Sequence, residues 1–139
     1  MDCRIREDIT QISVGDIVTS LYTDIRGDRK VGLFLVVYTE ENDPNDYNNR
    51  NVTGLKLTSK DLYANVYRTL VTTRDVPKLT NNSYIYSNKL STLLVSNCRY
   101  VAPLPSDLYE EVLDKLYIYL NQLQTQSSKA LINKIKGGK

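Results

Sequence analysis

With 139 residues, 41% of them hydrophobic and 24% charged, the chain has the size and composition of one globular domain. The formal net charge is only +2, and the absence of histidine excludes histidine triads and histidine general bases. Two distant cysteines do not fill a zinc site and glycine-rich phosphate-binding motifs are absent, so we expect neither a metal nor a cofactor.

The first element is expected at Val14–Leu21, where Gly15 forms a turn and Ile17 and Leu21 begin a strand alternation. The residues before it lack the apolar core of a secretory signal, which predicts a cytoplasmic protein with free thiols at Cys3 and Cys98. A polar turn follows over residues 22–30, marked by Gly27 and Asp28.

The most apolar stretch, Val31–Tyr38, predicts a central strand buried on both faces, and it is far too short to span a membrane. Residues 40–51 are rich in asparagine and acids and predict a loop. Asn51–Thr58 predicts a third strand, with a bulge at Gly54 because its apolar positions change phase there. A connecting turn is expected over residues 59–65.

Later segments continue the β pattern before a single helix. Four more short strands are predicted at Val66–Thr72, Ser83–Ser87, Ser91–Val95 and Tyr100–Ala102. Ser106 is a favourable N-cap, and apolar residues at helical spacing predict a helix from Asp107 to about Gln124. The last segment predicts a short, marginal second helix that ends at Gly137.

These elements predict an α+β domain: a small, SH3-like curved β-barrel closed by a C-terminal amphipathic helix. We expect this domain over residues 1–126, followed by a lysine-rich tail over residues 127–139. Four lysines and no acid lie in the last eleven residues, so the rest of the chain carries a formal charge of −2.

Two polar clusters are candidates for chemistry. Thr58, Ser59 and Lys60 end a strand with two hydroxyls and an ammonium, which suits a phosphate, although an ordinary strand exit uses the same residues to bond local backbone. The segment from Arg26 to Lys30 is a basic hairpin tip that either contacts phosphate or is simply solvated.

Eleven tyrosines against one phenylalanine form a third candidate feature. Tyr63, Tyr67, Tyr84 and Tyr86 are expected on or beside strands, where basic neighbours would favour stacking on bases. The alternative is that these tyrosines are half-buried fillers or anchors of an interface.

The order of these pieces resembles the MazF/PemK/Kid family of toxin endoribonucleases, over roughly Ile12 to Leu123. The matching elements, in chain order, are Gly15-Asp16-Ile17-Val18, Leu33–Tyr38 leading to Asn42-Asp43, Leu57-Thr58-Ser59, Ser83-Tyr84-Ile85 leading to Lys89–Thr92, and the helix from Leu108 to Leu123.

The resemblance implies an SH3-like barrel that forms a homodimer, cuts single-stranded RNA without a metal and is bound by a small acidic antitoxin. The ribose 2′-oxygen would attack the adjacent phosphorus, assisted by an arginine and a hydroxyl. Thr58 matches the catalytic threonine. The arginine position falls at Gly32, and Arg29, just upstream, is the expected substitute, with Lys30 and Arg26 as alternatives. The residues expected to bind substrate are Arg26, Lys30, Ser59, Lys60 and Lys89.

Two other functions stay open. One is a catalytically inactive relative, from a phage or mobile element, that binds a protein or nucleic acid on the same face. The other is a structural interaction protein whose tyrosines make a dimer.

Overall fold

The computed structural model describes residues 12–40, 50–60 and 66–137, with side chains described as far as Thr125. The predicted loop residues 41–49, the turn residues 61–65 with Tyr63, Cys3 and the side chains of the lysine-rich tail lie outside the described residues. The 32-residue C-terminal helix is too polar to cross a bilayer, and the described parts of the chain hold no other candidate.

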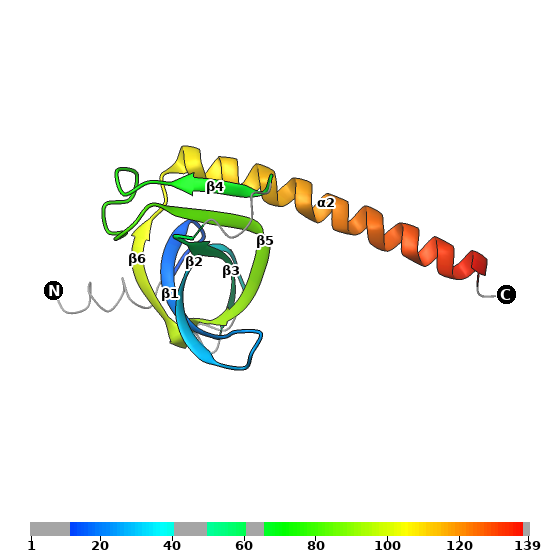
Figure 1. Cartoon of the computed structure of the whole chain (residues 1–139), viewed down its shortest axis with the longest axis horizontal. Helices are drawn as coiled ribbons and strands as arrows, with labels where there is room; N and C mark the ends of the chain where they lie inside the picture. The colour runs from blue at the N-terminus through cyan, green and yellow to red at the C-terminus, as the bar shows by residue number, and fades with distance from the viewer. Residues whose placement is uncertain (1–11, 41–49, 61–65, 138–139) are drawn as a thin grey trace.

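The described residues form one antiparallel sheet of six strands and one long helix. In chain order these are β1 (Asp16–Thr23), β2 (Arg29–Thr39), β3 (Asn51–Thr58), β4 (Arg68–Val71), β5 (Ser83–Leu94), the 3₁₀ turn η2 (Val95–Asn97), β6 (Cys98–Pro103) and α2 (Ser106–Gly137). The strand order is β4-β5-β3-β2-β1-β6. The sheet curls into a half-barrel and α2 lies beside β4 (Figure 1). The predicted curved barrel with a C-terminal helix is therefore confirmed.

The apolar run at the centre of β2 explains how the sheet builds two cores. Successive side chains of a strand point to opposite faces, so Leu35 joins one cluster while Phe34 and Val36 join the other. The first cluster packs under α2 through Val112 and Leu116, both buried. The second fills the other face, and the prediction of a central strand buried on both faces is confirmed.

The curvature of the sheet comes from irregular pairing along β5. Leu57 pairs with Ile85 and Leu55 with Leu90, so a step of two residues on β3 corresponds to five on β5. Extra residues on one strand bend it and increase its twist. β5 is therefore one continuous strand that folds around the half-barrel, where the sequence predicted two separate segments.

The bulge predicted at Gly54 lies beside it: Gly54 itself is paired, with Val36 on β2 and with Ser91 on β5, while the ladder with β2 is irregular at the next step, between Val36 and Tyr38. The irregular pairing on the β5 side lies between Leu55 and Leu57. Glycine is present at position 54 for lack of space: a Cβ there would lie 2.9 Å from Phe34 Cβ and 3.0 Å from Leu93 Cδ1.

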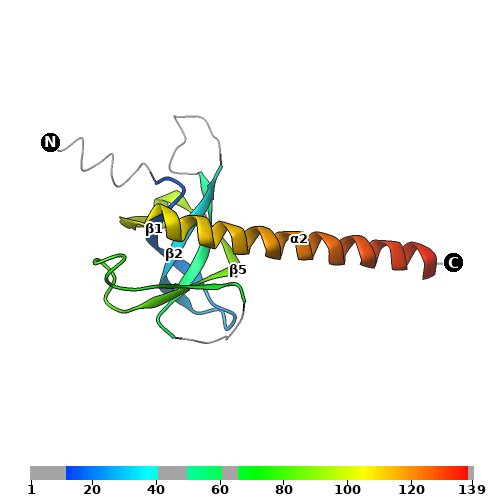
Figure 2. The same cartoon turned by 90° about the horizontal axis from the view of Figure 1, so that it is seen from above.

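The C-terminal helix also differs from the expectation. It begins at Ser106 itself, with the carbonyl of Pro105 accepting the first helical hydrogen bond from the Tyr109 N–H at 2.9 Å. It then continues without a break to Gly137, past the predicted end near Gln124. Its C-terminal half extends beyond the sheet, as seen in both views (Figures 1 and 2).

Candidate functional site

A hollow on the described surface lies where β1, β2, β3 and β5 meet the turn that joins β1 to β2. We call it the basic groove; its volume is about 830 Å³. The residues that give it chemical character are Lys30, Lys56, Lys60, Lys89, Thr58 and Ser59. Its lining includes one carboxylate, that of Asp24, so the formal charge of the lining is +3.

The end of β3 supplies the hydroxyl side of the groove. Thr58 is the last residue of β3, and its Oγ1 accepts a hydrogen bond from the Lys60 N–H at 3.2 Å. This is the local bond that an ordinary strand exit makes. Because a hydroxyl can accept and donate at once, the bond fixes the Thr58 oxygen and leaves its O–H available to a ligand.

The turn between β1 and β2 supplies an ion pair at the rim. Lys30 Nζ lies 3.0 Å from Asp24 Oδ2, while the backbone N–H groups of Arg26 and Asp28 each donate to Asp24 Oδ1 at 2.9 Å. The hydrogen bond with Lys30 is the main cause that lowers the pKa of Asp24, and it also raises the pKa of Lys30. Both groups therefore stay charged at neutral pH and cancel much of each other's field.

The structure brings together five of the seven residues predicted for the site, namely Lys30, Thr58, Ser59, Lys60 and Lys89. Arg29 and Arg26 do not line the groove, which corrects their predicted placement. Arg29 is exposed at the start of β2, and the β2 residues that line the groove begin at Lys30. Arg26 is exposed in the turn. None of the arginines in the described ranges lines the groove.

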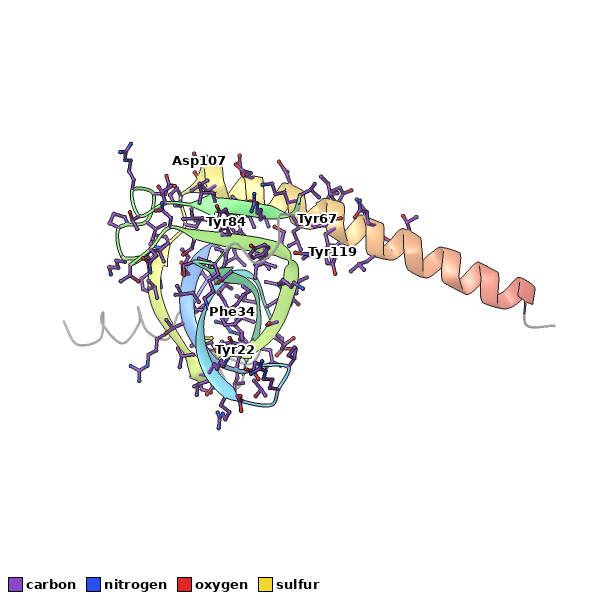
Figure 3. The ribbon with its side chains drawn as sticks, in the orientation of Figure 1. Tyr22, Phe34, Tyr67, Tyr84, Asp107 and Tyr119 are labelled. Atoms are coloured by element: carbon purple, nitrogen blue, oxygen red, sulfur yellow. The ribbon has the colours of Figure 1, made fainter. Side chains whose placement is uncertain are left out.

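Sequence reasoning missed Lys56 and Tyr22, which also line the groove. Lys56 pairs with Phe34 across β2 and β3, and its Nζ is 4.2 Å from the centroid of the Tyr22 ring and 5.0 Å from that of Phe34. The two rings meet edge to face with their centroids 5.7 Å apart, inside the curl of the sheet (Figure 3). The sequence did hold a signal for Lys56: it is two residues from Thr58 on one strand, and such residues face the same side.

Three further tyrosines make contacts within the chain, in keeping with the filler alternative for these residues. Tyr67 packs edge to face on Tyr119 of α2 at 5.3 Å and donates a hydrogen bond to Gln122 Oε1 (Figure 3). Arg68 lies over the Tyr84 ring, 4.9 Å from its centroid. Tyr86 is buried at the floor of the groove.

No family model matches the chain, and no curated protein matches it by sequence. Solved structures do match its fold. The structure titled MazE-MazF (Form-II) from Deinococcus radiodurans is 18% identical with a TM-score of 0.59, covering 79% of this chain and 96% of that chain. The Mycobacterium tuberculosis toxin MazF-mt6 is 14% identical with a TM-score of 0.55, covering 74% and 95%.

A structure described as an endoribonuclease from Mycobacterial species is 17% identical with a TM-score of 0.52, covering 81% of this chain and 94% of that chain. These likenesses span nearly the whole of each neighbour. At such low identity they establish the fold alone, and the resemblance noted in the sequence is confirmed at that level: the chain has the MazF fold.

Proposed function

We propose, from the premise that this chain has the MazF fold, that it is an endoribonuclease of the toxin–antitoxin type that cleaves single-stranded RNA without a metal ion. The observation that supports this most is the position of Thr58. Its fixed hydroxyl lies at the end of β3 in a groove whose lining carries four lysines and one carboxylate. Phosphate backbones bind where lysines and hydroxyls converge.

The reaction would be an internal transesterification. The ribose 2′-oxygen attacks the adjacent phosphorus, the new O–P bond forms, and the bond from phosphorus to the 5′-oxygen breaks. The 2′-hydroxyl loses its proton and the 5′-oxygen gains one, so the products are a 2′,3′-cyclic phosphate and a 5′-hydroxyl. Thr58 would donate to a phosphate oxygen, while Lys60 and Lys89 hold the flanking phosphates; a fixed donor at developing charge accelerates such steps by a hundred- to a thousandfold.

The test is incubation of the purified chain with mixed-sequence single-stranded RNA in EDTA. We expect defined fragments that end in cyclic phosphate, with Thr58→Ala reducing the rate about a hundredfold or more. Arg74→Ala is the charge control, because Arg74 is exposed in the loop between β4 and β5, away from the groove. Loss of all cleavage in EDTA would contradict metal independence, and no cleavage under any condition would contradict the enzyme.

A second candidate is a catalytically inactive binding module that uses the same groove. It is supported by the lack of an arginine among the described groove residues, because a lysine does not grip two phosphate oxygens as the planar guanidinium does. Binding of RNA without fragments in the same assay would favour this candidate over the nuclease.

The proposed partner is a small acidic antitoxin-like protein that covers the basic groove. A neighbour in fold is named as a MazE–MazF structure, which supports such a pairing. An acidic protein encoded beside this chain should bind it tightly and block RNA from the groove. Equal binding by a variant with Lys60 and Lys89 both changed to alanine would contradict the proposed site.

We also propose that the chain forms a homodimer. Several apolar side chains on α2 are exposed, among them Tyr117 at 68% and Ile118 at 51%. Exposed apolar patches of this kind mark interaction surfaces. Sedimentation velocity should show a dimer at micromolar concentration, and a monomer at all concentrations would contradict the proposal.

A further inference from the structure

The ammonium of Lys56 occupies a position that the fold has built for it. Lys56 and Thr58 are two residues apart on β3, so both side chains project from the same side of the strand. Both line the basic groove. The side chain of Lys56 crosses towards β2, where its Nζ lies over the Tyr22 and Phe34 rings. A cation over an aromatic face is held by about 0.5–2 kcal/mol, which keeps this flexible side chain in one place.

Gly32 supplies the space for this arrangement. A Cβ at position 32 would overlap Lys56 Nζ and lie 2.8 Å from Tyr22 Cε1. The backbone of Gly32 does not adopt a positive φ, so its conformation is open to other residues. The ammonium and the ring that cover Gly32 therefore occupy the space that a side chain at this position would take. The Tyr22 ring lies against Gly32 and meets the Phe34 ring edge to face.

The Lys56 ammonium lacks an acceptor within the described parts of the chain, where no hydrogen bond or ion pair to it is found. The single carboxylate of the groove lining, Asp24, is already bonded to Lys30 and to two backbone N–H groups. A lysine ammonium has three donors, and a partly buried charge without partners is costly. An anion placed between Lys56 and Thr58 would satisfy both groups.

We propose that Lys56 binds the phosphate at which RNA is cleaved, and that Gly32 keeps the space for its ammonium open. This inference rests on the proposed function, and it assigns to β3 the cation that sequence reasoning placed on Arg29. The ammonium donates to a non-bridging phosphate oxygen and opposes the charge that develops there. The Tyr22 and Phe34 rings hold the ammonium in place before the substrate arrives. A charge that is positioned in advance stabilises the transition state effectively.

The first experiment measures binding separately from cleavage. The probe is a fluorescent, mixed-sequence, single-stranded 2′-deoxy oligonucleotide, which lacks the attacking oxygen and cannot be cut. We expect Lys56→Ala to weaken binding at least tenfold and to lower the salt slope of log K by about 0.7, the value for one phosphate contact in a single strand. Lys56→Arg should stay within a few-fold of the wild type. Arg74→Ala should change binding less than twofold.

A second variant changes the position of the ammonium without removing its charge. Gly32→Ala conflicts with the flexible end of Lys56 and with one edge of Tyr22, so the sheet should fold with a similar unfolding midpoint. It should nevertheless weaken oligonucleotide binding and slow RNA cleavage by tenfold or more. If Gly32→Ala binds the oligonucleotide and cleaves RNA as the wild type does, the role proposed for Gly32 is wrong.

The outcomes separate this inference from the proposed function. If the wild type cleaves RNA and Lys56→Ala cleaves at the same rate, the phosphate site is wrong and the nuclease stands. If binding depends on Lys56 but no RNA is cut, the nuclease is wrong and the phosphate site stands. If the wild type neither binds the oligonucleotide nor cleaves RNA, both are wrong.

Discussion

At the scale of single residues, the space available for a side chain explains the glycines at positions 32 and 54. Gly54 shows this in the core, because a methyl group there would press on Phe34 Cβ and Leu93 Cδ1. Gly54→Ala should therefore destabilise the fold by roughly 1–3 kcal/mol, the usual cost of overpacking a core. Urea unfolding measures the loss. Thr92→Ala, at an exposed position of β5, is the control and should cost about 1 kcal/mol or less.

A second residue-scale prediction concerns Asp16 at the start of β1. Burial raises the pKa of this carboxyl, although the Ser13 N–H that donates to Oδ2 at 2.8 Å opposes the rise. A raised folded pKa means that the charged form is disfavoured by folding, so stability is lost as pH rises from about 3.8 through the folded pKa.

Asp16→Asn keeps an acceptor for Ser13 and removes the charge, so it should be more stable than the wild type at neutral pH. Its advantage should disappear below pH 3.8, where the wild-type carboxyl is protonated in both states. Urea midpoints at several pH values measure the difference. An equal deficit for the variant at every pH would contradict the assignment of burial as the dominant effect.

The hydroxyl side of the site could be predicted from sequence because Thr58, Ser59 and Lys60 end a clear strand. The position of Lys56 in the site could not be predicted, because Lys56 lies inside that strand, where a lysine usually indicates a solvent-exposed face. Its role depends on Tyr22 and Gly32, which belong to two other strands, and only the register between strands brings them together. Arg29 was expected in the groove, but the β2 part of the lining begins one residue later, at Lys30.

At the scale of elements, the attachment of α2 to the sheet depends on a few buried groups. The Ser87 hydroxyl on β5 donates to the Val112 carbonyl on α2 at 3.1 Å, and both residues are fully buried. Lys115 Nζ adds a bond to Thr69 Oγ1 on β4 at 3.1 Å and an ion pair with Glu111. These contacts fix the helix against the two strands at one end of the sheet.

Ser87→Ala should destabilise the fold by about 1 kcal/mol, the typical value of one buried hydrogen bond. The Val112 carbonyl keeps its place in the helix, so a larger loss is not expected. Ser96→Ala, at an exposed residue of η2, should change stability by less than about 0.5 kcal/mol. Identical unfolding curves for the two variants would contradict the contribution of the buried bond.

The extents of the elements show what sequence periodicity can and cannot supply. β3 was predicted with its observed bounds, because the asparagine-rich segment and the Thr-Ser-Lys exit bracket it. β5 was divided in two because polar Asn88 and Lys89 interrupt its apolar pattern at the bend. That bend depends on pairing with β3 and β4, which no local pattern encodes.

At the scale of the whole molecule, the barrel-and-helix architecture followed from the order of strands, loop and helix. The length of the helix did not follow from the sequence. The polar stretch after Gln124 predicts that the helix ends there, whereas the helix continues to Gly137. The described core contacts of α2 come from Leu108 to Leu116, near its N-terminal end. Among the described side chains of α2, which extend to Thr125, none beyond Leu116 belongs to the core.

A chain that ends at Thr125 should therefore keep its fold, in agreement with the predicted domain boundary at residue 126. Its thermal midpoint should lie within a few degrees of that of the full chain, while circular dichroism at 222 nm loses part of the helical signal. A collapse of the midpoint would show that the distal helix supports the barrel.

The overhang of α2 has a consequence for how the molecule moves in solution. At about 1.5 Å per residue, its 32 residues make a rod of roughly 48 Å attached at one end to a rounded body. Such a particle tumbles anisotropically, faster about the rod than across it. Amide vectors that lie along the rod should then show different ¹⁵N relaxation ratios from those that cross it.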